Sequence, residues 1–171
     1  MTDWTAYLDS VCEEYSQWWD GFTVMDVLDL EAERQSEEVR SPSEDKTWKV
    51  IEGLQNYAKD HVLLIGAPGS GKSTALRRLL LEIAQEVKEG KSDRIPVLVE
   101  LRYGENSLLR LILNSLWERD PELDLDEKIL DKKLRQGQFW LLLDGLNEIP
   151  SSELRSQLQN LMKFRPLGDF S

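Results

Sequence analysis

Three glycines, a lysine and a serine stand close together in the middle of the chain. Residues 66–73 read Gly-Ala-Pro-Gly-Ser-Gly-Lys-Ser. This order matches the P-loop pattern, in which a glycine and four further residues precede Gly-Lys-Ser or Gly-Lys-Thr. Such a loop turns several backbone N–H groups inward, and its small residues leave room for an anion between them. The pattern predicts a site for the phosphates of a nucleoside triphosphate.

Two side chains of this loop have separate expected tasks. Lys72 would supply a positive charge to the β- and γ-phosphates during catalysis, and Ser73 a hydroxyl ligand to Mg²⁺. The alternative is a glycine-rich turn without a ligand, but a match of this kind arises by chance in roughly one chain of this length in a hundred. The predicted phosphate-binding residues are Gly66, Pro68, Gly69, Ser70, Gly71, Lys72, Ser73 and Thr74.

One acidic residue closes a later apolar run. Residues 139–143 read Phe-Trp-Leu-Leu-Leu, and Asp144 follows them. Open α/β sheets bind ligands at the carboxyl ends of their strands, and a P-loop fold needs an acid there to hold the Mg²⁺ shell. We therefore predict that Asp144 joins Ser73 at the metal. The alternative role for Asp144 is to cap the turn before Gly145.

Three stretches together resemble the NACHT family of STAND-type P-loop NTPases. They are the loop and the residues after it (66–76), the segment Ile95–Arg102, and the run Leu-Leu-Leu-Asp-Gly-Leu-Asn-Glu at 141–148. The resemblance covers about residues 48–164. It implies binding of ATP, or of GTP, with Mg²⁺, slow hydrolysis, and use of the nucleotide as a signalling switch.

The acidic end of that run departs from the family pattern. The family has acids three and four positions after the Mg²⁺-holding Asp, whereas this chain has Asn147 and then Glu148. An amide cannot accept a proton, so Glu148 is the remaining candidate for the catalytic base or water-orienting residue. The alternative is that Glu148 is an exposed acid before Ile149. Arg77 and Arg78 fit a solvated helix face, and Arg102 is a weaker candidate for a phosphate contact.

Alternating strands and helices must position these residues. From residue 61 the pattern predicts an α/β fold, a three-layer P-loop NTPase core around a parallel sheet. The expected elements, in order, are a strand at 61–65, a helix at 72–88, a strand at 95–101, helices at 107–117 and 126–136, a strand at 139–144, and a helix at 151–164.

A helical N-terminal segment is expected to precede this core. Apolar residues recur at three-to-four spacing over residues 3–20, with Asp3 as the N-cap. Residues 31–46 are polar and predict a linker or a poorly ordered helix, and a further helix is expected over 48–59. The division is an acidic helical segment and linker at 1–47 and a partial NTPase domain at 48–171.

The sheet order implied by the family leaves a gap. A strand after the Asp144 strand normally lies between it and the P-loop strand, and only residues 165–171 follow the last helix. Without a strand at that position, the backbone N–H and C=O groups of the two neighbouring strands would have no hydrogen-bond partners. We therefore expect an incomplete sheet, truncated after the Asp144 region or completed by a borrowed strand, and nucleotide binding more than hydrolysis.

Charge and composition exclude several classes of protein. The net charge is −11, and residues 1–60 carry 15 Asp and Glu against 5 Lys and Arg. Nucleic acid and anionic membranes repel such a segment, so neither is an expected partner. No apolar run approaches the ~20 residues of a membrane helix. The lone Cys12 cannot form an internal disulfide, and the chain is expected in the cytoplasm.

Three functions remain at this point. The first is a NACHT-like ATP-binding switch in signal transduction, which acts through protein partners or self-association. The second is a truncated, non-catalytic nucleotide-binding or interaction fragment. The third is a small-molecule kinase, which would need lid arginines and an acceptor pocket that the sequence does not show. The absence of an Asn-Lys-x-Asp motif weakens a small-GTPase function.

Overall fold

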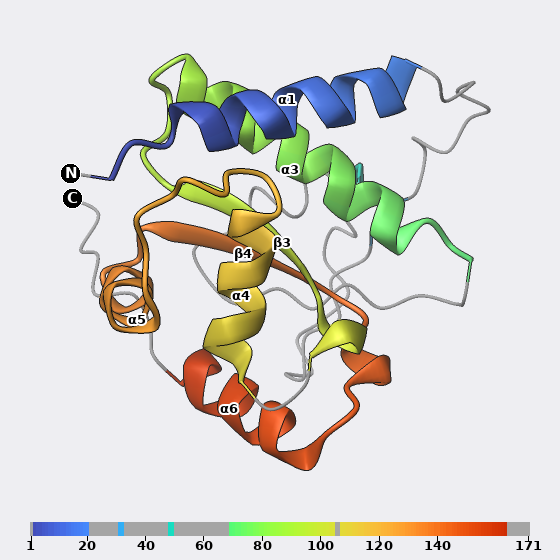
Figure 1. Ribbon diagram of the computed structural model, residues 1–171. Coiled ribbons are helices and arrows are strands. Elements are labelled where there is room, and N and C mark those ends of the chain that lie inside the picture. Colours follow the sequence, from blue (N-terminus) through green and yellow to red (C-terminus); the bar gives the residue numbers. More distant parts are fainter. Residues whose placement is uncertain (1, 21–30, 33–47, 50–68, 105–106, 164–171) are drawn as a thin grey trace, which may run out of the picture.

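Two parallel strands form the centre of the molecule. The computed structural model describes residues 2–20, 31–32, 48–49, 69–104 and 107–163 (Figure 1). Strand β3 (Ile95–Glu100) pairs with β4 (Phe139–Asp144) in parallel, with Glu100 opposite Asp144 at the carboxyl end. Helices lie on both faces of the pair, which gives the three layers expected from the sequence (Figure 1).

The helix that follows the P-loop covers one face of the strands. Helix α3 spans Lys72–Lys88, the predicted bounds, and contacts both strands. Helix α1 (Thr5–Asp20) lies along α3 in the antiparallel direction, as Figure 1 shows. An ion pair of 2.6 Å joins Asp9, near the start of α1, to Lys88, the last residue of α3. Asp3 accepts a hydrogen bond of 2.9 Å from the backbone N–H of Thr5, but the helix begins at Thr5, so Asp3 lies one residue before the N-cap position predicted for it.

Helix α1 is also in direct contact with the strands. The hydroxyl of Tyr7 donates a buried hydrogen bond of 2.8 Å to the backbone carbonyl of Pro96 in β3. Burial raises the pKa of the Tyr7 phenol, so the hydroxyl stays protonated and able to donate. Trp4 meets Phe139 edge to face, with ring centroids 5.5 Å apart. The first helix thus shares one hydrophobic core with the strands. The predicted domain boundary at residue 47 lies outside the described residues and stays a prediction.

Three helices complete the other side of the molecule. Ser107, Asp126 and Ser151 each accept a hydrogen bond from the backbone N–H three residues further on, so each caps a helix and the helix begins one residue later than expected. The helices are α4 (Leu108–Trp117), α5 (Glu127–Arg135) and α6 (Ser152–Met162). Short 3₁₀ turns follow the two strands, η2 (Leu101–Tyr103) after β3 and η3 (Leu146–Glu148) after β4.

The apolar residues of the helices face inward. Large side chains such as Leu80, Ile112 and Leu154 are fully buried, whereas among the described residues the exposed large apolar side chains are Tyr103, Ile129 and Met162. Helices with one apolar face, turned toward the strands, are typical of a three-layer core. None of the helices in the described ranges is both long and apolar enough to cross a bilayer.

The structure corrects two sequence predictions near the N-terminus. A helix was expected to begin at Trp48, but Trp48–Lys49 forms strand β2, antiparallel to β1 (Glu31–Ala32), which was expected in a linker or helix. Backbone pairing between distant residues has no local periodicity, so the apolar spacing could not indicate it.

The predicted strand at 95–101 ends one residue early, at Glu100, because Leu101 is the first residue of η2. The rest of the 48–59 helix and the strand at 61–65 lie outside the described residues.

We predict that Tyr7→Phe destabilises the protein by about 1–2 kcal/mol, because it leaves a buried carbonyl without its donor. Urea denaturation followed by circular dichroism measures the difference in the free energy of unfolding. Tyr103→Phe is the matched control: its ring is 67% exposed, and the same change there should have little effect. Equal stability of the two variants would contradict a structural role for the bond between α1 and β3.

Candidate functional site

The described half of the P-loop opens directly into α3. Gly69 and Gly71 have φ angles of 78° and 82°, the left-handed region that glycine adopts without strain. Gly71 occupies the N-cap position of α3 and has no side chain to cover the first N–H groups of the helix. An anion at this end would meet those N–H groups and the positive end of the helix dipole.

The predicted phosphate-binding residues fall into two groups. Gly69, Ser70, Gly71, Lys72, Ser73 and Thr74 stand together at the start of α3, whereas Gly66 and Pro68 lie outside the described residues. The Lys72 ammonium donates a hydrogen bond of 3.4 Å to the hydroxyl of Ser70, so the lysine lies over the loop. Among the described residues, nothing lies within 4 Å of a Cβ atom added to Gly69, so they leave the backbone there open to a ligand.

The predicted metal-binding Asp144 ends β4 and is followed by a sharp turn. Gly145 has a φ of 79°, and its carbonyl accepts a hydrogen bond of 2.8 Å from the N–H of Glu148. This 3₁₀ turn brings Glu148 back toward the end of the strand: its Cβ lies 3.8 Å from the position of a Cβ added to Gly145. Asn147 and Glu148 are both exposed. The turn places the two predicted acids, Asp144 and Glu148, at one edge of the sheet.

An ion pair ties α3 to that same edge. The guanidinium of Arg77 lies 3.7 Å from the carboxylate of Glu100, the register partner of Asp144. Side chains four residues apart share one face of a helix, so Ser73 lies one turn before Arg77 on the face directed at the strand ends. In Figure 1 the start of α3 and the carboxyl ends of β3 and β4 are on the same side of the molecule. The structure therefore joins α3, through Arg77, to the strand edge at which Asp144 stands.

Glu100 is a residue of this edge that no motif in the sequence indicates. Besides Arg77, this carboxylate accepts a hydrogen bond of 2.6 Å from Arg102, in η2. That hydrogen bond, and then the charges of Glu100, Tyr103 and Glu148, raise the pKa of Arg102. Two guanidinium groups offset the charge of Glu100, which makes this edge less repulsive to a polyphosphate. Arg77 was expected on a solvated helix face, but it pairs with Glu100. Because parallel strands have their carboxyl ends at the same edge of a sheet, the sequence could have placed Glu100 beside Asp144. It could not have indicated that two arginines pair with Glu100.

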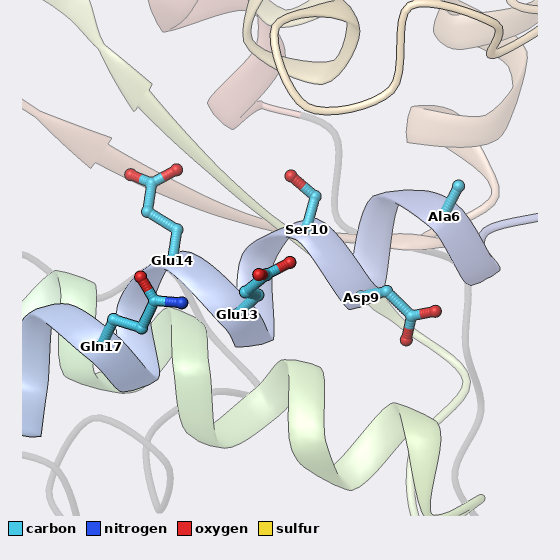
Figure 2. Close-up of a pocket in the computed structure, with 6 residues that line it drawn as sticks. All are labelled: Ala6, Asp9, Ser10, Glu13, Glu14 and Gln17. Atoms are coloured by element: carbon cyan, nitrogen blue, oxygen red, sulfur yellow. The ribbon is translucent and has the colours of Figure 1, made fainter.

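A separate hollow on the surface of α1 does not suit the same ligand. Figure 2 shows it lined by side chains of α1 alone, and three of these are acids, Asp9, Glu13 and Glu14. Asp9 pairs with Lys88, and Glu14 pairs with Arg119. A hollow with this charge repels phosphate.

Comparison with protein families agrees with the geometry. The model of the NACHT domain matches residues 60–164, a span that holds the P-loop, β3, β4 and α6 and more than half of the chain. The chain belongs to the NACHT domain family. A NACHT domain has the P-loop NTPase fold, so the predicted α/β class is confirmed, and nucleotide with Mg²⁺ is the ligand class of the family. The curated proteins and the solved structures give no match.

We predict that Gly69→Ala and Gly90→Ala differ in nucleotide binding but not in stability. Both glycines have positive φ (78° and 72°), and an added Cβ would meet nothing within 4 Å at either position. Each change should cost about 1–2 kcal/mol of strain, measured by urea denaturation. Only Gly69→Ala should weaken binding of Mg²⁺·ATP in calorimetric titration, because Gly90 lies after the far end of α3. Equal nucleotide affinity of the two variants would contradict a P-loop site at Gly69.

Proposed function

We propose that this NACHT domain is an ATP-binding, STAND-type signalling switch. The observation that carries the proposal is the meeting of the P-loop helix with the ends of β3 and β4, where Arg77 pairs with Glu100 beside Asp144. A P-loop alone supports phosphate binding. The loop together with a strand-end Asp supports binding of a triphosphate with its metal.

The residues present fit the group that the family implies. The open backbone at Gly69 and the first N–H groups of α3 suit a phosphate, and Lys72 would hold the β- and γ-phosphates. Ser73 would give its hydroxyl to Mg²⁺, and Asp144 would hold the metal's coordination shell. The bound Mg²⁺ would supply positive charge where charge develops on the γ-phosphate. We take ATP as the nucleotide, with GTP as the alternative; the absence of an Asn-Lys-x-Asp motif weakens only a small-GTPase function.

Glu148 is the residue we assign to water orientation. It stands in η3, three residues beyond Gly145, with its N–H fixed by the carbonyl of that glycine. Its side chain is exposed, and the amide of Asn147 precedes it. Because the amide of Asn147 cannot accept a proton, Glu148 would act without a second acid at the preceding position, so turnover should be slow. The same observation favours a second candidate, a domain that binds nucleotide without hydrolysing it.

The packing of α3 supports a role as a switch. The helix that would hold the phosphates also carries α1 along its length, so a shift at one end of α3 reaches the first helix. We infer that nucleotide state is read by protein partners or by a second copy of the chain in the cytoplasm. A small-molecule kinase is not supported by any residue of the described site.

The test is binding and turnover of Mg²⁺·ATP by the purified chain. Lys72→Ala removes the charge over the loop and should weaken binding by about 10- to 100-fold, the loss expected for a charged hydrogen bond. Lys91→Ala is the control, because Lys91 is an exposed lysine beyond the end of α3 paired with Glu89. Failure of the wild type to bind nucleotide would refute the proposal.

A second arm separates the two candidates. Glu148→Gln keeps the shape of the side chain and should leave ATP affinity unchanged, while a turnover that depends on this acid falls by about 100-fold or more. Binding by the wild type without measurable turnover would select the non-catalytic candidate. Turnover that survives the substitution unchanged would remove Glu148 from the mechanism.

A further inference from the structure

Arg102 stands at the strand edge that carries the candidate site, on η2. Its guanidinium donates a hydrogen bond of 2.6 Å to the Oε2 atom of Glu100. Its backbone nitrogen lies 3.8 Å from the position of a Cβ added to Gly145, so η2 lies directly against the turn after Asp144. The side chain is 49% exposed and is therefore able to change its position.

Two acids face this guanidinium. Glu100 holds it directly, and Glu148 interacts with it electrostatically from the turn after β4. The ring of Tyr103 lies 4.7 Å below the guanidinium and supports it from its own turn. Arg102 therefore occupies the space between the register partner of Asp144 and the candidate catalytic acid.

The carboxylate that holds Arg102 has a second cation. Arg77 of α3 lies 3.7 Å from Oε1, whereas Arg102 uses Oε2. If Arg102 moved away, Glu100 would still be paired. A half-exposed ion pair holds its partners weakly, because water screens the charges and both side chains lose freedom. A phosphate that offers two oxygens to the planar guanidinium competes well with such a carboxylate.

We propose that Arg102 reads the γ-phosphate, releasing Glu100 and pairing with the nucleotide only when that phosphate is present. The inference rests on the proposed nucleotide site and goes beyond it by naming the residue that tells ATP from ADP. The exchange needs no cation from outside the domain, and it leaves Glu100 with Arg77 on the helix that contacts α1. Arg102 is thus a specificity-determining residue, and the Glu100 carboxylate is its resting partner.

The experiment compares two nucleotides on the whole 171-residue chain. Calorimetric titration with Mg²⁺ and either ADP or the non-hydrolysable β,γ-imido analogue of ATP gives two dissociation constants for each variant. Arg102→Ala should weaken binding of the triphosphate by about 10-fold and leave ADP within about twofold, because the lost hydrogen bonds go to the γ-phosphate alone. Thermal denaturation checks that the variant folds like the wild type.

Arg135→Ala is the matched control. Arg135 is 50% exposed and pairs with Asp131 at 2.8 Å, much as Arg102 pairs with Glu100, but it ends α5 near the opposite, amino end of β4. Neither dissociation constant should change in this variant. Arg102→Lys keeps the charge but not the planar fork, so it should restore only part of the preference for the triphosphate.

Each outcome separates this inference from the proposed function. A wild type that binds neither nucleotide refutes both. A wild type that binds both, with an Arg102→Ala variant that loses ADP and triphosphate equally or loses neither, refutes the role of Arg102 and leaves the nucleotide site intact. An Arg102→Lys variant with the full wild-type preference shows that charge alone suffices and overturns the direct contact.

Discussion

The parallel pairing of β3 and β4 is the constraint on which the site depends. In this register Glu100 lies opposite Asp144, so the residues that follow the two strands, η2 and η3, meet at one edge. The first half of α3 reaches that edge through Arg77. A shift of the register by one residue would turn alternate side chains to the other face and separate these groups. The chemistry of the site is thus a consequence of strand pairing.

The first helix contacts the strands and α3 at the end that lies away from this edge. Tyr7 bonds to the backbone of β3, Trp4 packs on Phe139 at the start of β4, and Asp9 pairs with the end of α3. Burial raises the pKa of Tyr15 in α1, and the nearby charge of Arg119 opposes that rise. Under the proposed switch function, the packing of α1 along α3 is the route by which nucleotide state would reach the N-terminal surface.

Local signals in the sequence predicted most of the elements around the site. The bounds of α3 and β4 were correct because Gly71 and Lys72 mark a helix start and an unbroken apolar run marks a buried strand. The predicted helix starts at 107, 126 and 151 lie within one residue of the observed ones, because Ser107, Asp126 and Ser151 cap these helices. Local signals could not predict two other features. One is the pairing of Glu31–Ala32 with Trp48–Lys49, which joins residues that are distant in sequence. The other is the pair of arginines on Glu100, whose side chains are positioned by packing alone.

The central claim is that the start of α3 and the turn after β4 form a single nucleotide site. Hydrogen–deuterium exchange of the whole chain, with and without Mg²⁺·ATP, measures this most directly, because each peptide reports its own backbone protection. The account predicts slower exchange at residues 69–76 and at 144–148 together, and no change in α5. Protection of only one of the two segments, or of neither at saturating nucleotide, would contradict a shared site.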